Sequence, residues 1–360
     1  MDYGSTVIIR AATATATDNA RFAPLVVADP ASPLTIATYQ ARAAHGEYRP
    51  EWTWIAEEDS DGPVLAAGIW WGHSGEATPA TLDAIYTHDS VSRDDRPVVA
   101  GELIAAAHRA FAAAGGATPD FHLFLPGDWR GRHDVVTALT WRWQAALRAG
   151  LTEELERLRF EWTTAAGLPR DSGRLVYRAD PDDAVFENLL SRVLDGTLDA
   201  TTRKTANAVG PREQARLDVA FYRDKMVGDR GWWLVAQTRD GEAVGFGVPS
   251  RNAEFPVVGY LGVVPEHRGH GYVGDILAEI TRVLVAEAGA QTIHADTDLA
   301  NSVPSRSQAQ STRVHRHRSF RRLARGSAAG SARPERAPSS ITVMTYDHLL
   351  ARAEAVSTAL

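Results

Sequence analysis

The same hairpin pattern occurs twice in this sequence, with the same spacing and without gaps. An aromatic residue opens an apolar run, an Asp-Gly pair interrupts it, and a second apolar run ends at a glycine. Asp-Gly between two apolar runs predicts a tight hairpin, because glycine accepts a positive φ at the turn. Two unrelated hairpins could share this spacing by chance, so the flanking segments must show whether the chain contains an internal duplication. The landmarks are Trp54, Asp61-Gly62 and Gly68 in the first copy, and Trp233, Asp240-Gly241 and Gly247 in the second.

The flanking segments repeat as well. Each hairpin is preceded by helix-like sequence and followed by a strand, an amphipathic helix and another strand. We therefore expect an α/β (α+β) protein with two tandem domains, each a mixed, mostly antiparallel sheet flanked by helices. With 360 residues, 44% of them hydrophobic, the chain can form two cores of ordinary size. The repeated elements are residues 81–86, 101–114 and 121–125, then 257–264, 275–288 and 292–296.

The predicted organisation has four parts. Residues 1–20 are rich in Ala and Thr and lack the features of a signal peptide, so a flexible N-terminus is expected. The first domain covers 21–170 and the second 171–304, with a linker near Gly167 to Gly173. Residues 305–360 form an Arg-, Ser- and Ala-rich tail.

The composition of the chain argues against several classes of function. The net charge of −7 argues against nucleic acid or an anionic membrane as the main partner. The absence of cysteine excludes disulfides, thiolate ligands and a cysteine nucleophile. No apolar run approaches the roughly 20 residues that span a bilayer, and the histidines show no metal-ligand spacing. We expect a cytoplasmic protein without a bound metal.

A glycine-rich loop in the second copy is the most informative segment. An apolar strand from Val257 ends at Pro265, and the loop from Arg268 to Gly274 leads directly into a helix with one apolar face. Glycines at a helix N-terminus expose unpaired N–H groups at the positive end of the helix dipole, which suits a phosphate.

This loop resembles the acetyl-CoA site of the GCN5-related N-acetyltransferases, whose pattern is Arg/Gln-x-x-Gly-x-Gly/Ala. Arg268 and Gly271 match the first two fixed positions, whereas Val273 stands where Gly or Ala is usual and Gly274 follows one place later. The resemblance covers residues 175–301 well and the first half of the chain only in layout.

The resemblance implies a set of residues that bind acetyl-CoA. Residues 269–274 would hold the pyrophosphate, residues 261–263 would pair through their backbone with the pantetheine arm, and Asn301 would lie near the cofactor. The implied set is Leu261, Gly262, Val263, Arg268, Gly269, His270, Gly271, Tyr272, Val273, Gly274 and Asn301.

A dinucleotide-binding oxidoreductase is a competing interpretation. Residues 269–274 also spell GxGxxG, and Asp296 or Asp298 ends the next strand. Against it, the residues from Pro265 to Arg268 separate the strand from the first glycine, and no further βαβ unit follows Asn301.

The first copy has no such loop. Its corresponding stretch is residues 88–97, in which Pro97 donates no N–H and the Asp94 and Asp95 carboxylates would repel a pyrophosphate. We expect this copy to act as a scaffold or as a wall of the substrate site.

The expected reaction is acetyl transfer to a primary amine by direct attack, since no cysteine can carry the acyl group. The resemblance offers Asp296, five residues before Asn301, as the base, and Asp298 on the same strand face as its reserve. The alternative is that both acids merely end a strand. The acceptor, a small-molecule or peptide amine, is not defined, and a non-catalytic acyl-CoA-binding or regulatory protein is the alternative function.

The sequence departs from the family after Asn301, where a helix, a Gly-Tyr and a final strand should follow. Residues 305–340 instead contain nine arginines and the single acid Glu335. One interpretation is a disordered basic tail able to contact RNA or acidic partners. The other is that the tail is read out of the ancestral frame, which the nucleotide sequence of the gene would decide.

Overall fold

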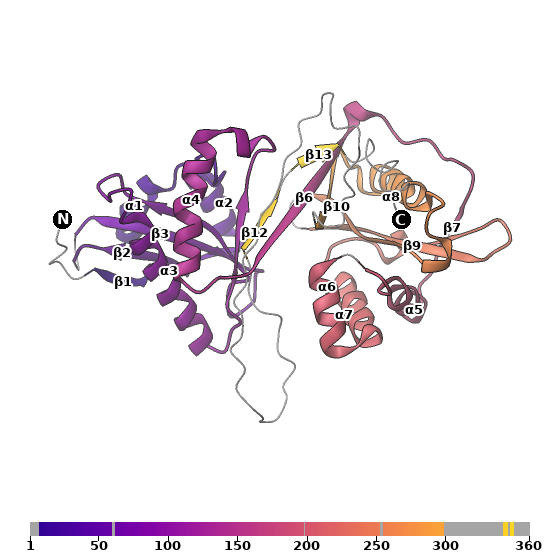
Figure 1. Ribbon diagram of the computed structural model, residues 1–360, viewed down its shortest axis with the longest axis horizontal. Coiled ribbons are helices and arrows are strands. Elements are labelled where there is room, and N and C mark those ends of the chain that lie inside the picture. The colour runs from indigo at the N-terminus through magenta and orange to yellow at the C-terminus, as the bar shows by residue number, and fades with distance from the viewer. Residues whose placement is uncertain are drawn as a thin grey trace. The chain divides into compact units, whose positions relative to one another are not determined.

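The computed structural model describes residues 7–59, 62–197, 199–252, 255–298, 341–344 and 346–348. The chain forms two compact units (Figure 1). Of the described residues, 7–157 and 341–344 belong to the first, and 158–298 and 346–348 to the second.

The first unit is built on a mixed sheet. Its first four strands pair antiparallel in sequence order, and β4 then pairs in parallel with β5. The next position is taken by β12, which runs parallel to both β5 and the first half of β6. The strands are β1 (Ile8–Ala11), β2 (Tyr48–Glu57), β3 (Val64–Trp71), β4 (Thr81–Thr87), β5 (Asp120–Phe124), β6 (Glu154–Thr163) and β12 (Ile341–Met344).

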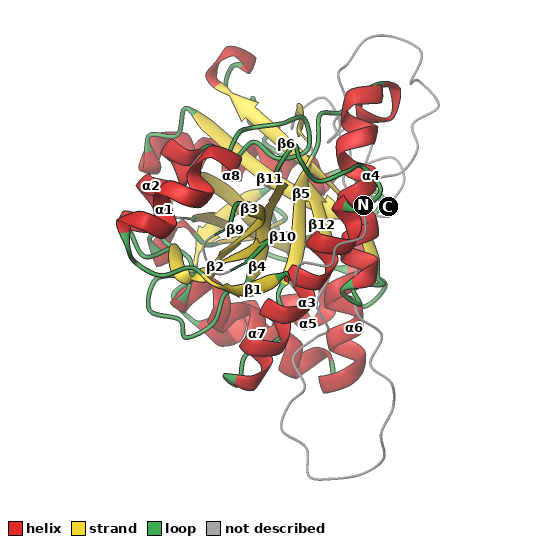
Figure 2. Ribbon diagram, turned by 90° about the vertical axis from the view of Figure 1, so that its left-hand side faces the viewer, coloured by secondary structure: helices red, strands yellow, loops and turns green. Residues whose placement is uncertain are grey.

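Helices cover both faces of this sheet, and Figure 2 shows α1 and α2 on the opposite side of the strands from α3 and α4. Successive strand residues point to opposite faces, so Ala66 of β3 joins the core under α3 and α4, whereas Ala67 joins the core under α1 and α2. The helices are α1 (Ala16–Phe22), α2 (Ile36–Ala44), α3 (Arg96–Ala113) and α4 (His133–Arg148), with 3-10 turns at Ala23–Leu25 and Trp129–Gly131. A further 3-10 turn, Thr164–Ala166, follows β6 and belongs to the second unit.

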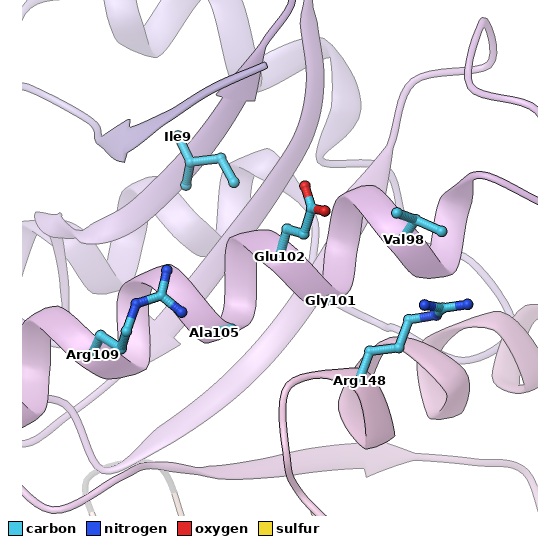
Figure 3. A pocket seen from close by; sticks show the side chains of 7 residues that line it. All are labelled: Ile9, Val98, Gly101, Glu102, Ala105, Arg109 and Arg148. Atoms are coloured by element: carbon cyan, nitrogen blue, oxygen red, sulfur yellow. The ribbon is translucent and has the colours of Figure 1, made fainter. Parts of the chain in front are cut away.

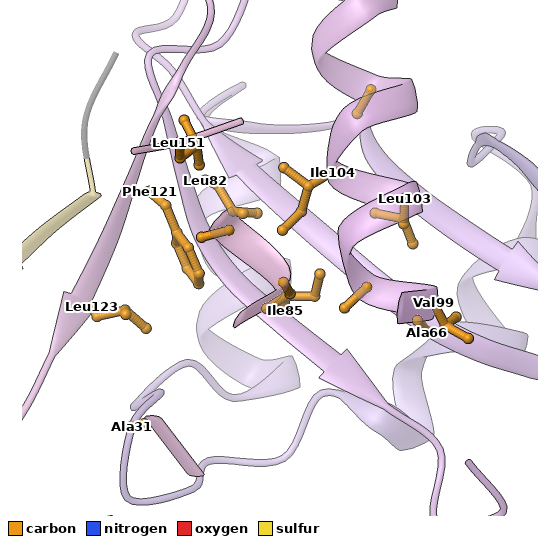
Figure 4. Close-up of a cluster of buried hydrophobic side chains, with 14 of the residues drawn as sticks. Ala31, Ala66, Leu82, Ile85, Val99, Leu103, Ile104, Phe121, Leu123 and Leu151 are labelled. Carbon is orange, nitrogen blue, oxygen red and sulfur yellow. The ribbon is translucent and has the colours of Figure 1, made fainter. Parts of the chain in front are cut away.

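The contact of α3 with the sheet shows why a glycine ends the first hairpin. Leu103 and Ile104 of α3 are fully buried against the strands (Figure 4). A Cβ on Gly68 of β3 would lie 2.7 Å from Cζ3 of Trp70 and 2.8 Å from Cδ2 of Leu103, so a side chain at this position would force these core side chains to move. Each such leucine or isoleucine contributes about 1.5–3 kcal/mol by leaving water.

The second unit repeats this plan. From β7 to β10 its strands pair antiparallel in sequence order, β10 pairs in parallel with β11, and the second half of β6 follows β11. The short β13 also pairs with β6. The strands are β7 (Val176–Ala179), β8 (Leu234–Gln237), β9 (Ala243–Arg251), β10 (Pro256–Val263), β11 (Thr292–Asp298) and β13 (Tyr346–His348).

Helix α8 covers one face of the second sheet, and α5 and α7 cover the other. A Cβ on Gly247 of β9 would lie 2.9 Å from Cδ1 of Ile280 on α8, the same relation that Gly68 has to α3. The predicted architecture of two mixed sheets flanked by helices is therefore confirmed. The helices are α5 (Asp183–Val193), α6 (Ala200–Val209), α7 (Pro211–Asp224) and α8 (Tyr272–Ala288), with 3-10 turns at Arg230–Trp232 and Pro265–His267.

The N-terminus differs from the expected flexible segment at 1–20. Strand β1 pairs with β2, and Arg10 of β1 makes a two-pronged ion pair with Asp18 of α1, with N–O distances of 2.7 and 2.8 Å. The fully buried Glu57 carboxylate pairs with Arg10 at 2.5 Å and also with Arg21. A buried carboxylate needs such partners, and the patterns of single elements do not reveal them.

The domain boundaries of the structure also differ from the predicted ones. Residues 158–163 of β6, expected to close the first domain, belong to the second unit. Within the predicted tail, β12 and β13 are strands, whereas residues 299–340 and 349–360 lie outside the described part of the chain, and Asn301 with them. Within the described residues, no helix combines the length and apolar character that crossing a membrane requires.

The ion pair at the N-terminus gives a test of stability. The Arg10 guanidinium holds the pKa of Asp18 well below its usual range, so the pair stabilises the fold above the unfolded-state pKa of about 4. Asp18→Asn should lower the free energy of unfolding by about 2 kcal/mol at pH 7, as measured by urea denaturation.

The difference between Asp18→Asn and the parent should shrink as the pH falls below about 4, because the carboxyl of the unfolded chain then binds a proton while the native carboxylate stays ionised. The matched control is Asp134→Asn, whose exposed carboxylate pairs with Arg132 at 2.8 Å and should change stability little. Equal effects of the two substitutions would contradict a stabilising role for β1 and α1.

Candidate functional site

The glycine loop of the second unit joins the end of β10 to the start of α8. After the turn at Pro265–His267, Gly269 and Gly271 have φ values of 79° and 77°, and α8 begins at Tyr272. Only glycine adopts these left-handed values without strain. Gly271 is also the N-cap of α8, so no side chain covers the first turn of the helix.

The N-terminus of α8 leaves its backbone donors available. Among the loop and turn hydrogen bonds of the described residues, the segment 269–274 donates through Gly274 to the Gly271 carbonyl at 3.1 Å, and residues 269–273 donate none. Unpaired N–H groups at the positive end of a 17-residue helix form an anion site. The predicted pyrophosphate cradle is therefore geometrically possible.

Arg174 holds this loop in place, and sequence reasoning missed it. Its guanidinium donates to the carbonyls of His270 and Gly271, at 2.8 and 3.3 Å, and pairs with Asp275 in the first turn of α8 at 2.5 Å. In a trans peptide the N–H points opposite to the C=O. The N–H groups of Gly271 and Tyr272 consequently point away from Arg174. Because 96 residues separate Arg174 from His270, no local motif could have revealed the contact.

The side chain of Arg268 has a different role from the one the motif implied. It donates to the Val263 carbonyl at 3.3 Å and to the Val193 carbonyl at 3.0 Å. The guanidinium thus fastens the loop to the end of β10 and to α5. His270 Nδ1 contacts the Arg268 carbonyl at 2.9 Å, and its ring stacks on Tyr272 at 5.6 Å.

Strand β10 carries a bulge and separates from its neighbour. The register against β9 shifts between Val258 and Tyr260, which leaves Gly259 as the extra residue. Within the described residues, the ladder between β10 and β11 consists of Val257 and His294. The residues from Val257 to Leu261 are only partly buried, although the strand is central in its sheet. No described residue of β11 therefore pairs with Leu261, Gly262 or Val263, the segment predicted to bind pantetheine.

The two acids of β11, Asp296 and Asp298, are less well placed to act as the base than the sequence predicts. Asp296 accepts two hydrogen bonds from Arg159 of β6, at 2.7 and 2.8 Å. A carboxylate engaged by both of its oxygens is a poor proton acceptor, so the geometry argues against Asp296 as the base. Asp298 is fully buried at the end of β11. Nearby, His294 contacts Glu161 at 3.1 Å, and burial lowers the pKa of its imidazole.

The corresponding loop of the first unit forms no cradle. Asp95 and Arg96 both donate their N–H groups to the Ser92 carbonyl, at 3.1 and 3.0 Å, and Pro97 occupies the first turn of α3. At the start of α3 the N–H groups of Asp95 and Arg96 are thus bonded within the loop, and Pro97 has none.

Neither of two surface hollows is lined by residues of the glycine loop. One, of about 400 Å³, lies beside α3 in the first unit, with Glu102, Arg109 and Arg148 among its lining residues (Figure 3). The other, of about 360 Å³, lies between α5 and the edge of β8 in the second unit. The first lining offers one carboxylate and two guanidinium groups but no hydroxyl or imidazole that could act as a nucleophile or its partner.

Comparison of the chain with known proteins finds similar solved structures. No family model and no curated protein matches the sequence. The solved structures that the chain resembles include a GCN5-related N-acetyltransferase from Sphaerobacter thermophilus, with 17% identity, 89% of this chain and 96% of that chain covered, and a TM-score of 0.49.

Two further solved structures are named as members of the same superfamily. A tandem GNAT protein from the clavulanic acid biosynthesis pathway is 16% identical over 82% of this chain and 90% of its own, with a TM-score of 0.41. A GCN5-related N-acetyltransferase from Kribbella flavida is 12% identical over 79% and 93%, with a TM-score of 0.38.

The contact between Arg174 and the loop can be tested with CoA as the probe. Arg174→Ala should weaken CoA binding about fivefold to tenfold in calorimetry, because the peptide planes at His270 and Gly271 lose their anchor. Arg174→Lys should recover only part of the affinity, since one ammonium cannot replace the planar guanidinium.

The matched control is Arg178→Ala, which removes an equally exposed arginine paired with Asp180 in the same unit. This variant should bind CoA as the parent does. Unchanged affinity in Arg174→Ala would show that the loop keeps its conformation without the anchor.

Proposed function

We propose that this chain is an acyltransferase that transfers an acetyl group from acetyl-CoA to a primary amine. The observation that carries the proposal is the meeting of two features at one end of β10. Within the described residues, a glycine loop with unpaired N–H groups opens α8, and beside it the end of β10 does not pair with β11. The first feature suits a pyrophosphate, and the second suits an extended arm that pairs with a strand.

The loop and the end of β10 match two neighbouring parts of acetyl-CoA, the pyrophosphate and the pantetheine arm. The N–H groups of residues 269–273 would bind the pyrophosphate, and the open backbone of Leu261 to Val263 would bind the pantetheine arm. When bound, acetyl-CoA supplies a thioester that an amine can attack. The resemblance of the chain to named N-acetyltransferases supports this assignment.

The acceptor is a small-molecule or peptide amine, and the chain contributes no acyl carrier of its own. With no cysteine in the sequence, the amine attacks the thioester directly. The protein's task is then to hold the amine neutral and correctly oriented. Asp296 is engaged with Arg159, so the proton acceptor must be sought elsewhere.

A dinucleotide-binding function fits the structure less well. The doubly wound fold that reads GxGxxG needs a parallel sheet, whereas β7 to β10 pair antiparallel. A non-catalytic CoA sensor would share the loop but release no free CoA. Thiol release from acetyl-CoA in the presence of an amine panel separates these functions, and a chain without cysteine gives no background with thiol reagents.

The loop itself is tested by Gly271→Ala. A Cβ at a left-handed φ of 77° strains the loop and occupies the space of the ligand. The affinity for acetyl-CoA should fall at least about tenfold, which corresponds to about 1.4 kcal/mol. Calorimetry with acetyl-CoA and with NAD measures the effect and tests both ligands.

Gly289→Ala is the matched control, because Gly289 is left-handed at the other end of the same helix, with φ 61° and open space around it. It should strain α8 without changing affinity. Equal losses in the two variants, or binding of NAD in place of acetyl-CoA, would exclude the proposed site.

The stoichiometry follows from the difference between the two units. Calorimetry should give one acetyl-CoA per chain, because Pro97 and the bonded N–H groups of Asp95 and Arg96 replace the cradle in the first unit. A stoichiometry of two would show that the first unit also binds the ligand.

A further inference from the structure

Helix α7 lies directly over the bulge of β10. Its buried face includes Ala215 and Val219, which pack with Phe246 of β9. One turn further on, the Tyr222 hydroxyl donates to the Gly259 carbonyl at 2.6 Å. The bulge residue and the helix are therefore tied together, and groups on this side of α7 face the part of β10 that precedes the proposed pantetheine segment.

Asp218 lies one turn before Tyr222 on the same side of α7. Its Oδ1 accepts from Nε2 of Gln214 at 2.7 Å. Its Oδ2 is enclosed, and no hydrogen-bond donor of the described residues reaches it. Burial, opposed by the Gln214 hydrogen bond and assisted by the charge of Asp199, raises the pKa of Asp218 to about 6. A buried carboxylate oxygen without a donor is costly and marks a site where a ligand can bind.

The charged and titratable groups around Asp218 are acids and phenols. Asp199 comes from the N-cap of α6, Tyr222 from α7 and Tyr260 from β10. The Tyr260 ring stacks on Phe246 at 5.5 Å, and burial together with Asp218, Tyr222 and Asp199 raises the pKa of its hydroxyl. The negative field of this cluster favours a cation, such as an ammonium group.

Resting on the acyl transfer proposed above, we infer that Asp218 is the general base, and that its Oδ2 accepts a proton from the ammonium of the acceptor. The position is suited to the task, because α7 is tied to the bulge of β10, the strand that would hold the pantetheine arm. A base with a pKa of about 6 is ionised at neutral pH and still accepts protons. Asp296 is engaged by Arg159 through both oxygens, which makes it the poorer proton acceptor of the two.

The proposed step balances without a further reactant. Asp218 takes one proton from the ammonium, and the nitrogen lone pair attacks the carbonyl carbon of the thioester to form the C–N bond. The C–S bond then breaks and its electron pair leaves with the sulfur. The nitrogen gives its second proton to the thiolate, which yields the amide and free CoA thiol. Asp218 finally releases its proton to water.

The test compares Asp218→Asn with the parent and with Asp224→Asn, an exposed carboxylate at the end of the same helix. The readouts are acetyl-CoA affinity by calorimetry, the rate of CoA release with a panel of cadaverine, tyramine, glucosamine and a free peptide N-terminus, and the melting temperature from pH 4 to 8. The parent rate should fall on the acid side of about pH 6, where Asp218 becomes protonated.

Asp218→Asn should lower kcat/KM at least about a hundredfold at pH 7.5, lose the fall in rate near pH 6, and keep acetyl-CoA affinity within about twofold. Its melting temperature should exceed the parent's at pH 8 and match it near pH 4, because a raised folded-state pKa makes the ionised carboxylate destabilising above that pKa. A structural role would lower rate and melting temperature together. Asp218→Glu should retain a base and some of the rate.

The outcomes separate this inference from the function on which it rests. A parent that does not bind acetyl-CoA, or binds it and acetylates no amine, removes the proposed function and the inference with it. An active parent whose rate and pH profile are unchanged in Asp218→Asn overturns the inference alone. If Asp218→Asn does not fold, an unchanged pH profile in Asp218→Glu overturns it as well.

Discussion

Both units depend on the close approach of one helix to one strand at a glycine. In the first unit α3 rests on Gly68, and in the second α8 rests on Gly247, where any Cβ would come within 3 Å of a helix side chain. Interiors are packed too densely to absorb such an overlap. The helix position in turn decides where its N-terminus meets the end of the preceding strand. The glycine at the end of each hairpin therefore sets the geometry of the loop that follows.

The order of elements could be predicted because it is encoded in short-range patterns. The paired hairpins, the apolar face of α8 and the loop from Arg268 to Gly274 all depend on residues a few positions apart, and the structure contains each of them. The contacts that define the site chemically are of another kind. Arg159 and Asp296 are 137 residues apart, and Arg174 and His270 are 96 apart. Such pairings depend on tertiary packing, which a local pattern does not contain.

Asp296 and Asp218, the two carboxylates considered as the general base, show the same difference between what a local pattern reveals and what tertiary packing determines. Asp296 was chosen for its place relative to a motif, yet its partner comes from β6, far away in the sequence. Asp218 belongs to no motif, and its character comes from burial, Gln214 and Asp199. Sequence position identifies which carboxylates are near a site, whereas desolvation and hydrogen bonding decide which of them exchanges protons near neutral pH.

The bare N-terminus of α8 has a consequence for the lifetime of the protein. Helix α3 begins with Pro97 after a loop whose donors are bonded, so its start is complete without a ligand. Helix α8 begins with donors that a bound anion would satisfy, so an anion bound there would stabilise the second unit, by an amount that grows with the ratio of ligand concentration to Kd. If the ligand is acetyl-CoA, a cell short of it would hold more of this protein in locally opened forms that proteases attack. The abundance of the protein would then follow the acetyl-CoA supply without any change in gene expression.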